Sequence, residues 1–388
     1  MIVGRTKSKI VNKSVQTNLK TRVMIDKLQT KGKMFPYELN NHNGPVKMVA
    51  MNKDSTMFAS CCPQDKKVFL YDAFNYTVLN VFFTKHAVSA LKFTDDSEYL
   101  IGFCSMDGVY FLKVDDFTNL TGLSEMPKSS KHRLVLFDSF KIKSGDLSYG
   151  SNQLLLIREE LFKENEDYKV NHLEVYNLKD FLNSPKDSKF YKYRTFSKEL
   201  KPDEAAHKAI FALDANWIFY ATLTELVKFN IKTSEIEVRI SFKELQLTKI
   251  NSITKSLKYE VLAVCGNQGG YILDPVTLTE MKRFPTEFPM NTIAISPRLS
   301  FKKNRKLHLV MGGGVTARDT AHSKQGGTEI LLYNIINEEN LSKMLGHYGP
   351  VNYLDWYKDG KGFISAGEEG IVRIYRFDQS YFTDPKLN

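Results

Sequence analysis

Cysteine, tryptophan and long apolar runs are scarce in this sequence of 388 residues, and each scarcity excludes a class of protein. None of the four cysteines forms a Cys-x-x-Cys pair or stands at metal-ligand spacing to a histidine, so neither a zinc site nor a disulfide framework is predicted. No apolar stretch is long enough to cross a membrane, and the N-terminus lacks a secretion signal. We therefore expect a soluble, non-secreted protein with reduced cysteines on buried strands.

Acidic residues are almost absent from residues 1–33, which hold nine lysines and arginines and one acid, Asp26. The other 355 residues carry a net charge of only +2, so most of the net charge of +10 belongs to this segment. The body of the protein is close to neutral. It therefore lacks the overall basicity that is typical of a nucleic-acid-binding domain.

Short segments with strand composition follow one another along the body, and turn residues separate them. Residues 41–72 and 346–378 match across three such segments, from a histidine before Gly-Pro-Val to a tyrosine at the end of the third strand. A further copy lies at 88–114, and weaker copies lie at about 134–200, 208–242, 249–285 and 290–345. A repeated unit with Gly-His near its start and Trp-Asp at its end is the WD-repeat signature, with tyrosine here in place of tryptophan. The sequence predicts an all-β, seven-bladed WD-repeat β-propeller.

The repeated polar residues predict a buried hydrogen-bond network in the first and last repeats. In the last repeat, His347 is expected to bridge the turn acid Glu369 and the hydroxyl of Ser365, which then reaches Tyr375. The corresponding residues of the first repeat are His42, Asp65, Ser60 and Tyr71. Each buried polar group left without its partner costs about 1–3 kcal/mol, so such a set is kept or lost together.

Residues 34–40 have strand composition but no repeat of their own, and the last repeat is one strand short. We expect this segment to complete the last blade and to protect both open sheet edges. The predicted domains are an extension at 1–33, a propeller at 34–382 and a short tail at 383–388.

The stretch from Phe284 to Phe382 carries a family resemblance. It contains FPMNTIAISP, then VMGGG with the insert VTARDT, then LGHYGPVN, the unit KDGKGFISAGEEGIVRIYRFD and a closing SYF. In this order the motifs resemble the i subunit of eukaryotic translation initiation factor three. The likeness is close over about 100 residues, and over 34–283 it holds only blade by blade.

The resemblance implies a non-enzymatic, cytoplasmic scaffold subunit that acts in mRNA recruitment and scanning on the small ribosomal subunit. It also implies binding to the b subunit, through that protein's C-terminal helix, and to the g subunit. Asp274 stands where the family has an acidic residue at the end of the third strand of blade five, and it is the candidate contact for the b subunit. The alternative is a WD-repeat scaffold of another intracellular complex, which would lack the motifs of 284–382.

Three interpretations remain open for residues 1–33, predicted to be disordered: an arm on ribosomal RNA, a mitochondrial transit peptide, or a solvated extension without a task. The candidate RNA contacts are Arg5, Lys7, Lys9, Lys13, Lys20 and Arg22.

Two patterns that suggest chemistry fit a structural role better. Gly312-Gly313-Gly314 is not followed by the Gly-Lys-Ser/Thr of a phosphate-binding loop. Ser365 is one place too far from Gly362 for a nucleophile elbow, and both Ser365 and His347 have counterparts in the first repeat. We therefore predict no catalytic residue, no metal site and no cofactor.

Overall fold

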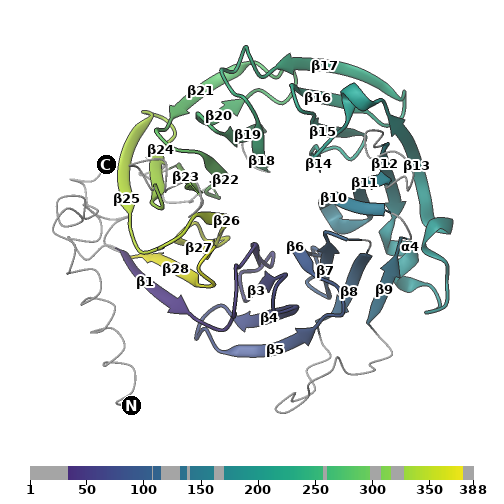
Figure 1. The fold of residues 1–388 in the computed structure, drawn as a ribbon, viewed down its shortest axis with the longest axis horizontal. Coiled ribbons are helices and arrows are strands. Elements are labelled where there is room, and N and C mark those ends of the chain that lie inside the picture. Colours follow the sequence, from purple (N-terminus) through teal and green to yellow (C-terminus); the bar gives the residue numbers. More distant parts are fainter. Residues whose placement is uncertain are drawn as a thin grey trace.

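Seven antiparallel sheets of four strands each form a ring in this computed structural model (Figure 1). Propeller blades arranged in this way surround a central channel. The structure describes residues 34–106, 108–114, 132–137, 140–160, 170–256, 260–297, 307–315 and 327–378. The predicted seven-bladed propeller is confirmed. No helix within these ranges is long and apolar enough to cross a membrane.

Each of blades 1 to 6 begins at the channel and ends at the rim. Blade 1 contains β2 (Met48–Met51), β3 (Met57–Cys62), β4 (Lys67–Asp72) and β5 (Val78–Phe83). Blade 2 contains β6 (Val88–Phe93), β7 (Tyr99–Cys104), β8 (Gly108–Lys113) and β9 (Arg133–Leu136). Blade 3 contains β10 (Phe140–Leu147), β11 (Gln153–Glu160), β12 (Asn171–Asn177) and β13 (Arg194–Leu200), with the short helix α4 (Leu178–Asn183) between the last two. Three single 3-10 turns lie at Tyr149–Ser151, Phe190–Tyr193 and Pro202–Glu204.

The second half of the ring repeats this plan. Blade 4 contains β14 (Lys208–Phe211), β15 (Trp217–Ala221), β16 (Glu225–Asn230) and β17 (Glu235–Ser241). Blade 5 contains β18 (Ile250–Ser256), β19 (Val261–Gly266), β20 (Gly269–Leu273) and β21 (Glu280–Pro285). Blade 6 contains β22 (Met290–Ile295), β23 (His308–Gly313), β24 (Ile330–Asn334) and β25 (Glu339–Met344). Blade 7 contains β26 (Val351–Trp356), β27 (Gly362–Gly367) and β28 (Val372–Phe377).

The fourth strand of blade 7 comes from the other end of the described chain. β1 (Met34–Leu39) pairs antiparallel with β28, from Met34 opposite Phe377 to Leu39 opposite Val372. The two strands lie side by side where the ring closes (Figure 1). Blade 7 is therefore shared between segments more than 300 residues apart, as the lone strand segment at 34–40 led us to expect. The predicted disordered extension at 1–33 and the predicted tail at 383–388 lie outside the described residues.

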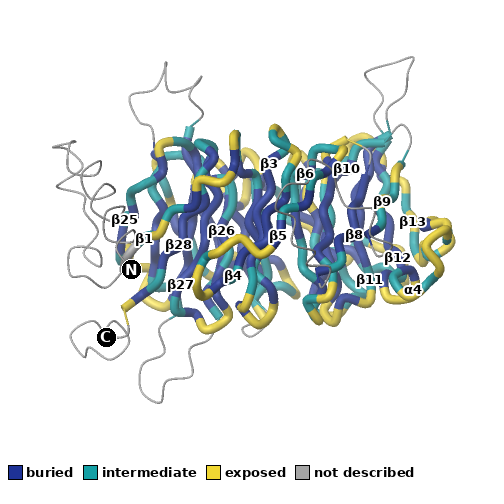
Figure 2. Tube along the Cα trace, turned by 90° about the horizontal axis from the view of Figure 1, so that it is seen from below, coloured by how far each residue is buried: buried dark blue, intermediate teal, exposed yellow. Residues whose placement is uncertain are grey.

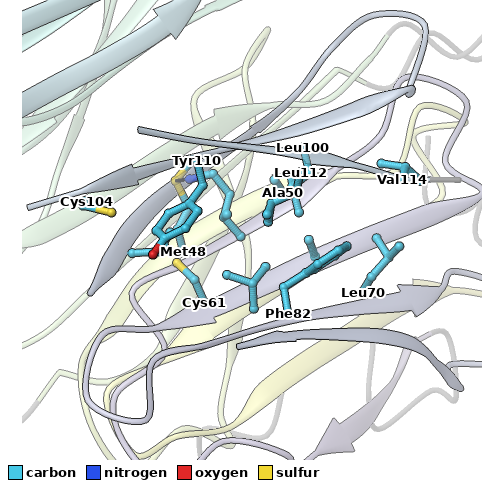
Figure 3. Close-up of a cluster of buried hydrophobic side chains, with 14 residues drawn as sticks. Met48, Ala50, Cys61, Leu70, Phe82, Leu100, Cys104, Tyr110, Leu112 and Val114 are labelled. Carbon is cyan, nitrogen blue, oxygen red and sulfur yellow. Dashed lines mark hydrogen bonds between the residues drawn. The ribbon is translucent and has the colours of Figure 1, made fainter. Parts of the chain in front are cut away.

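The apolar core is divided among the interfaces between blades. One cluster lies between each pair of neighbouring blades, so there are seven clusters around the ring. In the cluster between blades 1 and 2, Met48 and Phe82 of the first blade pack against Leu100 and Tyr110 of the second (Figure 3). Buried residues accordingly run through the middle of every blade, and exposed ones gather at the loops (Figure 2). Each blade thus buries its apolar faces only against two neighbours.

Polar side chains also join consecutive blades near the start of their innermost strands. In blades 4 to 7, one side chain at this level donates a hydrogen bond to a backbone carbonyl of the following blade. The pairs are His207 with Ile250 (2.8 Å), Asn251 with Met290 (2.9 Å), Asn291 with Val351 (3.1 Å) and Asn352 with Val46 (2.9 Å). The last of these pairs crosses the closure from blade 7 to blade 1.

Removal of residues 1–40 should lower the melting temperature by ~5–10 °C or more, because it opens β28 and exposes the cluster between blades 7 and 1. Removal of residues 1–33 should change it little. Differential scanning calorimetry of the two truncated proteins measures this difference. Equal melting temperatures would show that the pairing of β1 with β28 does not close the ring.

Candidate functional site

The predicted network of the last blade is present around His347. Its Nδ1 atom donates to the Glu369 carboxylate at 2.5 Å, and its Nε2 atom lies 2.7 Å from the Ser365 hydroxyl. The tight turn between β27 and β28 brings the acid over the ring, while Ser365 projects from β27. Tyr375 is also buried, but its hydroxyl forms no hydrogen bond with the described residues. The expected link from Ser365 to Tyr375 is therefore replaced by packing, and Tyr375 stacks on Phe363.

The first blade contains the same arrangement with its fourth member bonded. His42 Nδ1 donates to Asp65 at 2.9 Å, and its Nε2 lies 2.7 Å from the Ser60 hydroxyl. The hydroxyls of Ser60 and Tyr71 are 3.4 Å apart. The sequence pattern thus located the two histidines, the two serines and the two acids of both networks.

Arg373 is a member of the last network that sequence reasoning missed. It is 1% exposed, and its Nη1 atom donates to Glu369 at 2.6 Å. Its Nε atom donates to Glu38 of β1 at 3.0 Å. Because the first repeat has Phe69 at the corresponding place, an arginine at a position that is apolar in the first repeat was the available signal. This side chain connects the histidine network to the strand that closes the ring.

A second buried network, also missed, lies in blade 3. Both oxygens of the Glu174 carboxylate accept from Arg158, at 2.5 and 2.6 Å. Tyr176 and Arg194 donate to the same carboxylate, at 2.7 and 2.9 Å. Burial raises the pKa of Glu174, but these four donors outweigh it and hold the pKa below its ordinary value. This blade therefore replaces the histidine network with an ion pair.

The His347 and Ser365 pair is inaccessible to a substrate. His347 is 5% exposed and Ser365 is fully buried. Burial lowers the pKa of His347 in spite of its hydrogen bond to Glu369, so the imidazole is neutral at pH 7. A nucleophilic serine needs access to a carbonyl carbon, which this packing denies. The geometry fits a structural network.

The glycines of β23 and the turn after it also have packing roles. A Cβ atom on Gly312 would lie 2.7 Å from Val351 of the next blade, and one on Gly313 would lie 2.0 Å from the carbonyl of Pro289. Gly314 has a φ of 129°, which other residues rarely adopt. Close approach of backbones explains this run without a bound phosphate.

One group of side chains in blade 1 has ligand types suited to a metal ion. The ligand atoms of His42, Cys62 and Asp65 lie within 4.8 Å of one another. Asp65, however, already accepts hydrogen bonds from His42 and from the backbone N–H groups of Asn43 and Lys67. The His–Asp pair also recurs in the last blade as His347 and Glu369, where Gly367 replaces the cysteine. A structural role accounts for these contacts.

Asp274, the candidate partner contact, caps the turn between β20 and β21. Its Oδ1 atom accepts from the backbone N–H groups of Val276 and Thr277, both at 2.8 Å. The bonds from Thr277 and then Val276 hold the pKa of this carboxyl below its ordinary value, so it is ionised at pH 7. Asp72 caps the equivalent turn of blade 1 in the same way, with Phe74 and Asn75 as donors. Asp274 therefore has a local structural role as well as a charge.

A largely apolar cavity of about 300 Å³ lies beside this turn, between blades 4 and 5. Pro275 and Val276, which directly follow Asp274, form part of its wall. The side chain of Val276 is 63% exposed. The other apolar residues that line the cavity include Trp217, Phe219 and Leu262. The charged residues that line it are Asp214, Glu260, Lys228 and Lys255. Sequence reasoning identified the acid but not the cavity, because two blades contribute to it.

Six candidate RNA contacts, Arg5, Lys7, Lys9, Lys13, Lys20 and Arg22, lie outside the described residues.

Replacing His347 by alanine should lower the free energy of unfolding by about 1–3 kcal/mol at pH 7.5, because Ser365 loses the imidazole as its partner and Glu369 keeps only Arg373 as a side-chain donor. The loss should shrink towards pH 5.5. The folded pKa of His347 lies below its ordinary 6.5, so acid stabilises the unfolded wild type by protonating this histidine. Urea unfolding at both pH values measures the effect.

His172→Ala is the control, because His172 is partly exposed, its contact with Glu160 is long at 3.4 Å, and its ring otherwise packs edge-on against Phe140. Its effect should stay below ~0.5 kcal/mol. A hydrolytic activity that disappears in His347→Ala, with an unchanged melting curve, would instead make His347 catalytic.

Comparison with known proteins agrees with this architecture. The family model described as "WD domain, G-beta repeat" matches residues 34–72 and 338–376. The chain is 33% identical over 160 residues to eukaryotic translation initiation factor 3 subunit I of Homo sapiens, a match that covers 41% of this chain and 46% of that protein. It is 38% identical over 113 residues to the subunit I of Bombyx mori, covering 29% and 32%. The chain is also 39% identical over 113 residues to the subunit I of Drosophila willistoni, a match that covers 29% of this chain and 33% of that protein.

The chain thus matches less than half the length of these relatives. It is similar to WD-repeat proteins, and the resemblance seen in its motifs is confirmed.

Proposed function

We propose that this WD-repeat propeller, which is similar to subunit I of eukaryotic translation initiation factor 3, is a non-enzymatic scaffold subunit of that factor. It would act in the cytoplasm, in mRNA recruitment and scanning on the small ribosomal subunit, and would bind the b and g subunits. The observation that carries the proposal is the match to subunit I proteins, joined to a closed propeller whose His–Ser pairs are buried. A scaffold of another intracellular complex is the alternative.

The surface beside Asp274 supports a helix-binding role. A helix that docks in a groove needs apolar anchors, and charges at the rim fix its orientation. The cavity between blades 4 and 5 offers apolar contacts through Trp217 and Val276. Asp274 offers a charge at the rim, since its carboxylate lies at the start of the turn that forms one wall of the cavity. A basic residue next to an apolar one on the C-terminal helix of the b subunit would satisfy both.

The complex should be recoverable from cells. The tagged protein is expected to co-purify with the b and g subunits and to sediment with small ribosomal subunits. Affinity purification with mass spectrometry and sucrose-gradient sedimentation measure this. If neither subunit is recovered, the initiation-factor proposal fails and the scaffold of another complex remains.

Charge at position 274 should matter more than charge elsewhere on the rim. Asp274→Asn keeps an oxygen that can cap the turn and removes the charge, whereas Asp274→Lys reverses the charge. We expect both to weaken binding of the b-subunit helix, with Asp274→Lys losing at least ~10-fold in affinity by isothermal titration calorimetry. Val276→Asp should weaken it as well, because it places a charge in the apolar wall.

Asp72→Asn and Asp72→Lys are matched controls, because Asp72 caps the equivalent turn of blade 1. They should leave helix binding unchanged while they test the cost of losing the cap. If the Asp72 and Asp274 variants lose stability equally and neither loses affinity, Asp274 only caps its turn. The b-subunit contact then lies elsewhere.

The N-terminal extension is proposed to contact RNA weakly through Arg5, Lys7, Lys9, Lys13, Lys20 and Arg22. Nine cationic side chains in 33 residues should bind RNA without sequence preference, and the affinity should fall steeply as salt rises. Fluorescence anisotropy with a labelled single-stranded RNA at 50 and 200 mM KCl measures this. An RNA affinity that is unchanged by removal of residues 1–33 would contradict the assignment.

A further inference from the structure

Three lysines lie on or directly beside the innermost strands of blades 3 to 5. The innermost strands of all blades run in the same direction, so their first residues lie at the same end of the ring. Lys208 is the first residue of β14, and Lys249 immediately precedes β18. Lys143 lies at the β-bulge of β10. The hydrogen bond from His207 to the carbonyl of Ile250 joins the neighbours of Lys208 and Lys249, which places these two lysines on either side of one contact.

The charges of Lys208 and Lys249 are not neutralised by the protein. Lys143 pairs with Glu159 at 2.9 Å, and Lys92 and Lys255 share Asp146 at 3.2 and 3.6 Å. Within the part of the chain that the structure describes, neither Lys208 nor Lys249 forms an ion pair or a side-chain hydrogen bond, and both are exposed to solvent. They are therefore available to a ligand.

The electrostatic environment of this channel end is positive. Although the side chain of Lys208 reaches solvent, the protein around it restricts its hydration and lowers its pKa, and the charges of Lys249 and then Lys92 act in the same direction. Burial also lowers the pKa of His207, and Lys208, Lys249 and Lys143 add to this effect. The charge effects on these two side chains come mainly from lysines, because the buried thiol of Cys265 near Lys208 has a raised pKa and is neutral.

His207 adds an independent sign of an incomplete site. Its Nε2 atom donates to Ile250, while its Nδ1 atom is buried without a hydrogen-bond partner among the described residues. Such orphaned nitrogens are uncommon in folded proteins. An anion beside Lys208 would favour protonation of this imidazole and would remove the conflict among the neighbouring positive charges.

We propose that the channel end formed by Lys208, Lys249 and His207 binds a small anion that carries several phosphate groups. Lysine ammonium groups bind phosphate as point charges, and a recess with one sign of charge concentrates counter-ions. A compact polyphosphate can reach both ammonium groups inside the ring. The site is independent of the proposed b-subunit surface, because the cavity beside Asp274 is lined by Lys255 and Ser256 at the other end of β18.

Isothermal titration calorimetry of the full chain with pyrophosphate, ATP and inositol hexakisphosphate at 150 mM KCl tests the proposal and separates nucleotide from inositol sources. At least one probe should bind, and Lys208→Gln with Lys249→Gln should weaken it at least ~10-fold. Lys208→Arg, which keeps the charge, should retain most of the affinity. The matched control is the double variant Lys282→Gln and Lys358→Gln, which removes two surface lysines paired with Glu338 and Asp54.

Unchanged melting temperatures without ligand show that the variants fold. If the Lys208 and Lys249 double variant does not fold, each single substitution should weaken binding at least ~3-fold. The proposal is overturned if the wild type binds none of the probes at millimolar concentration. It is also overturned if the channel variant and the control variant bind equally well, or if these lysines bind only RNA.

Discussion

The pairing of β1 with β28 is the contact on which the ring depends. Every apolar cluster lies between two blades, so no blade has a complete core of its own. An open ring would expose the cluster between blades 7 and 1 together with an unpaired sheet edge. Arg373 adds a polar connection at the same place, because it bonds Glu38 of β1 and Glu369 of its own blade. Closure and blade packing therefore support each other.

The blades satisfy their buried polar groups in different ways. Blades 1 and 7 use a histidine between an acid and a serine. Blade 3 uses Glu174 with two arginines and a tyrosine. Both solutions bury charge only where several donors surround a carboxylate, which is the condition for a buried charge to be tolerated. Repeats can therefore lose their sequence signature and keep the same backbone.

The two ends of the ring differ chemically between blades 4 and 5. One end has an apolar cavity beside an ionised aspartate. The other end has Lys208 and Lys249, which form no ion pair with any carboxylate among the described residues. Proteins that act through their surfaces commonly place contacts on loops supported by a rigid scaffold, and both features fit that plan. Asp274 shows how one side chain can cap a turn through one oxygen and still present its charge to a partner.

Sequence alone determined the seven blades, because strand composition and the spacing from His42 to Tyr71 and from His347 to Tyr375 record the repeat directly. It also located the histidine networks, since their members recur at fixed intervals, and it singled out residues 34–40 because the last repeat lacked a strand. Only the tertiary structure determined the contacts of Arg373 and Glu174 and the cavity beside Val276. It also determined the surroundings of Lys208 and Lys249. Each of them depends on side chains from distant segments, and a ring brings such segments together only after every blade has taken its place.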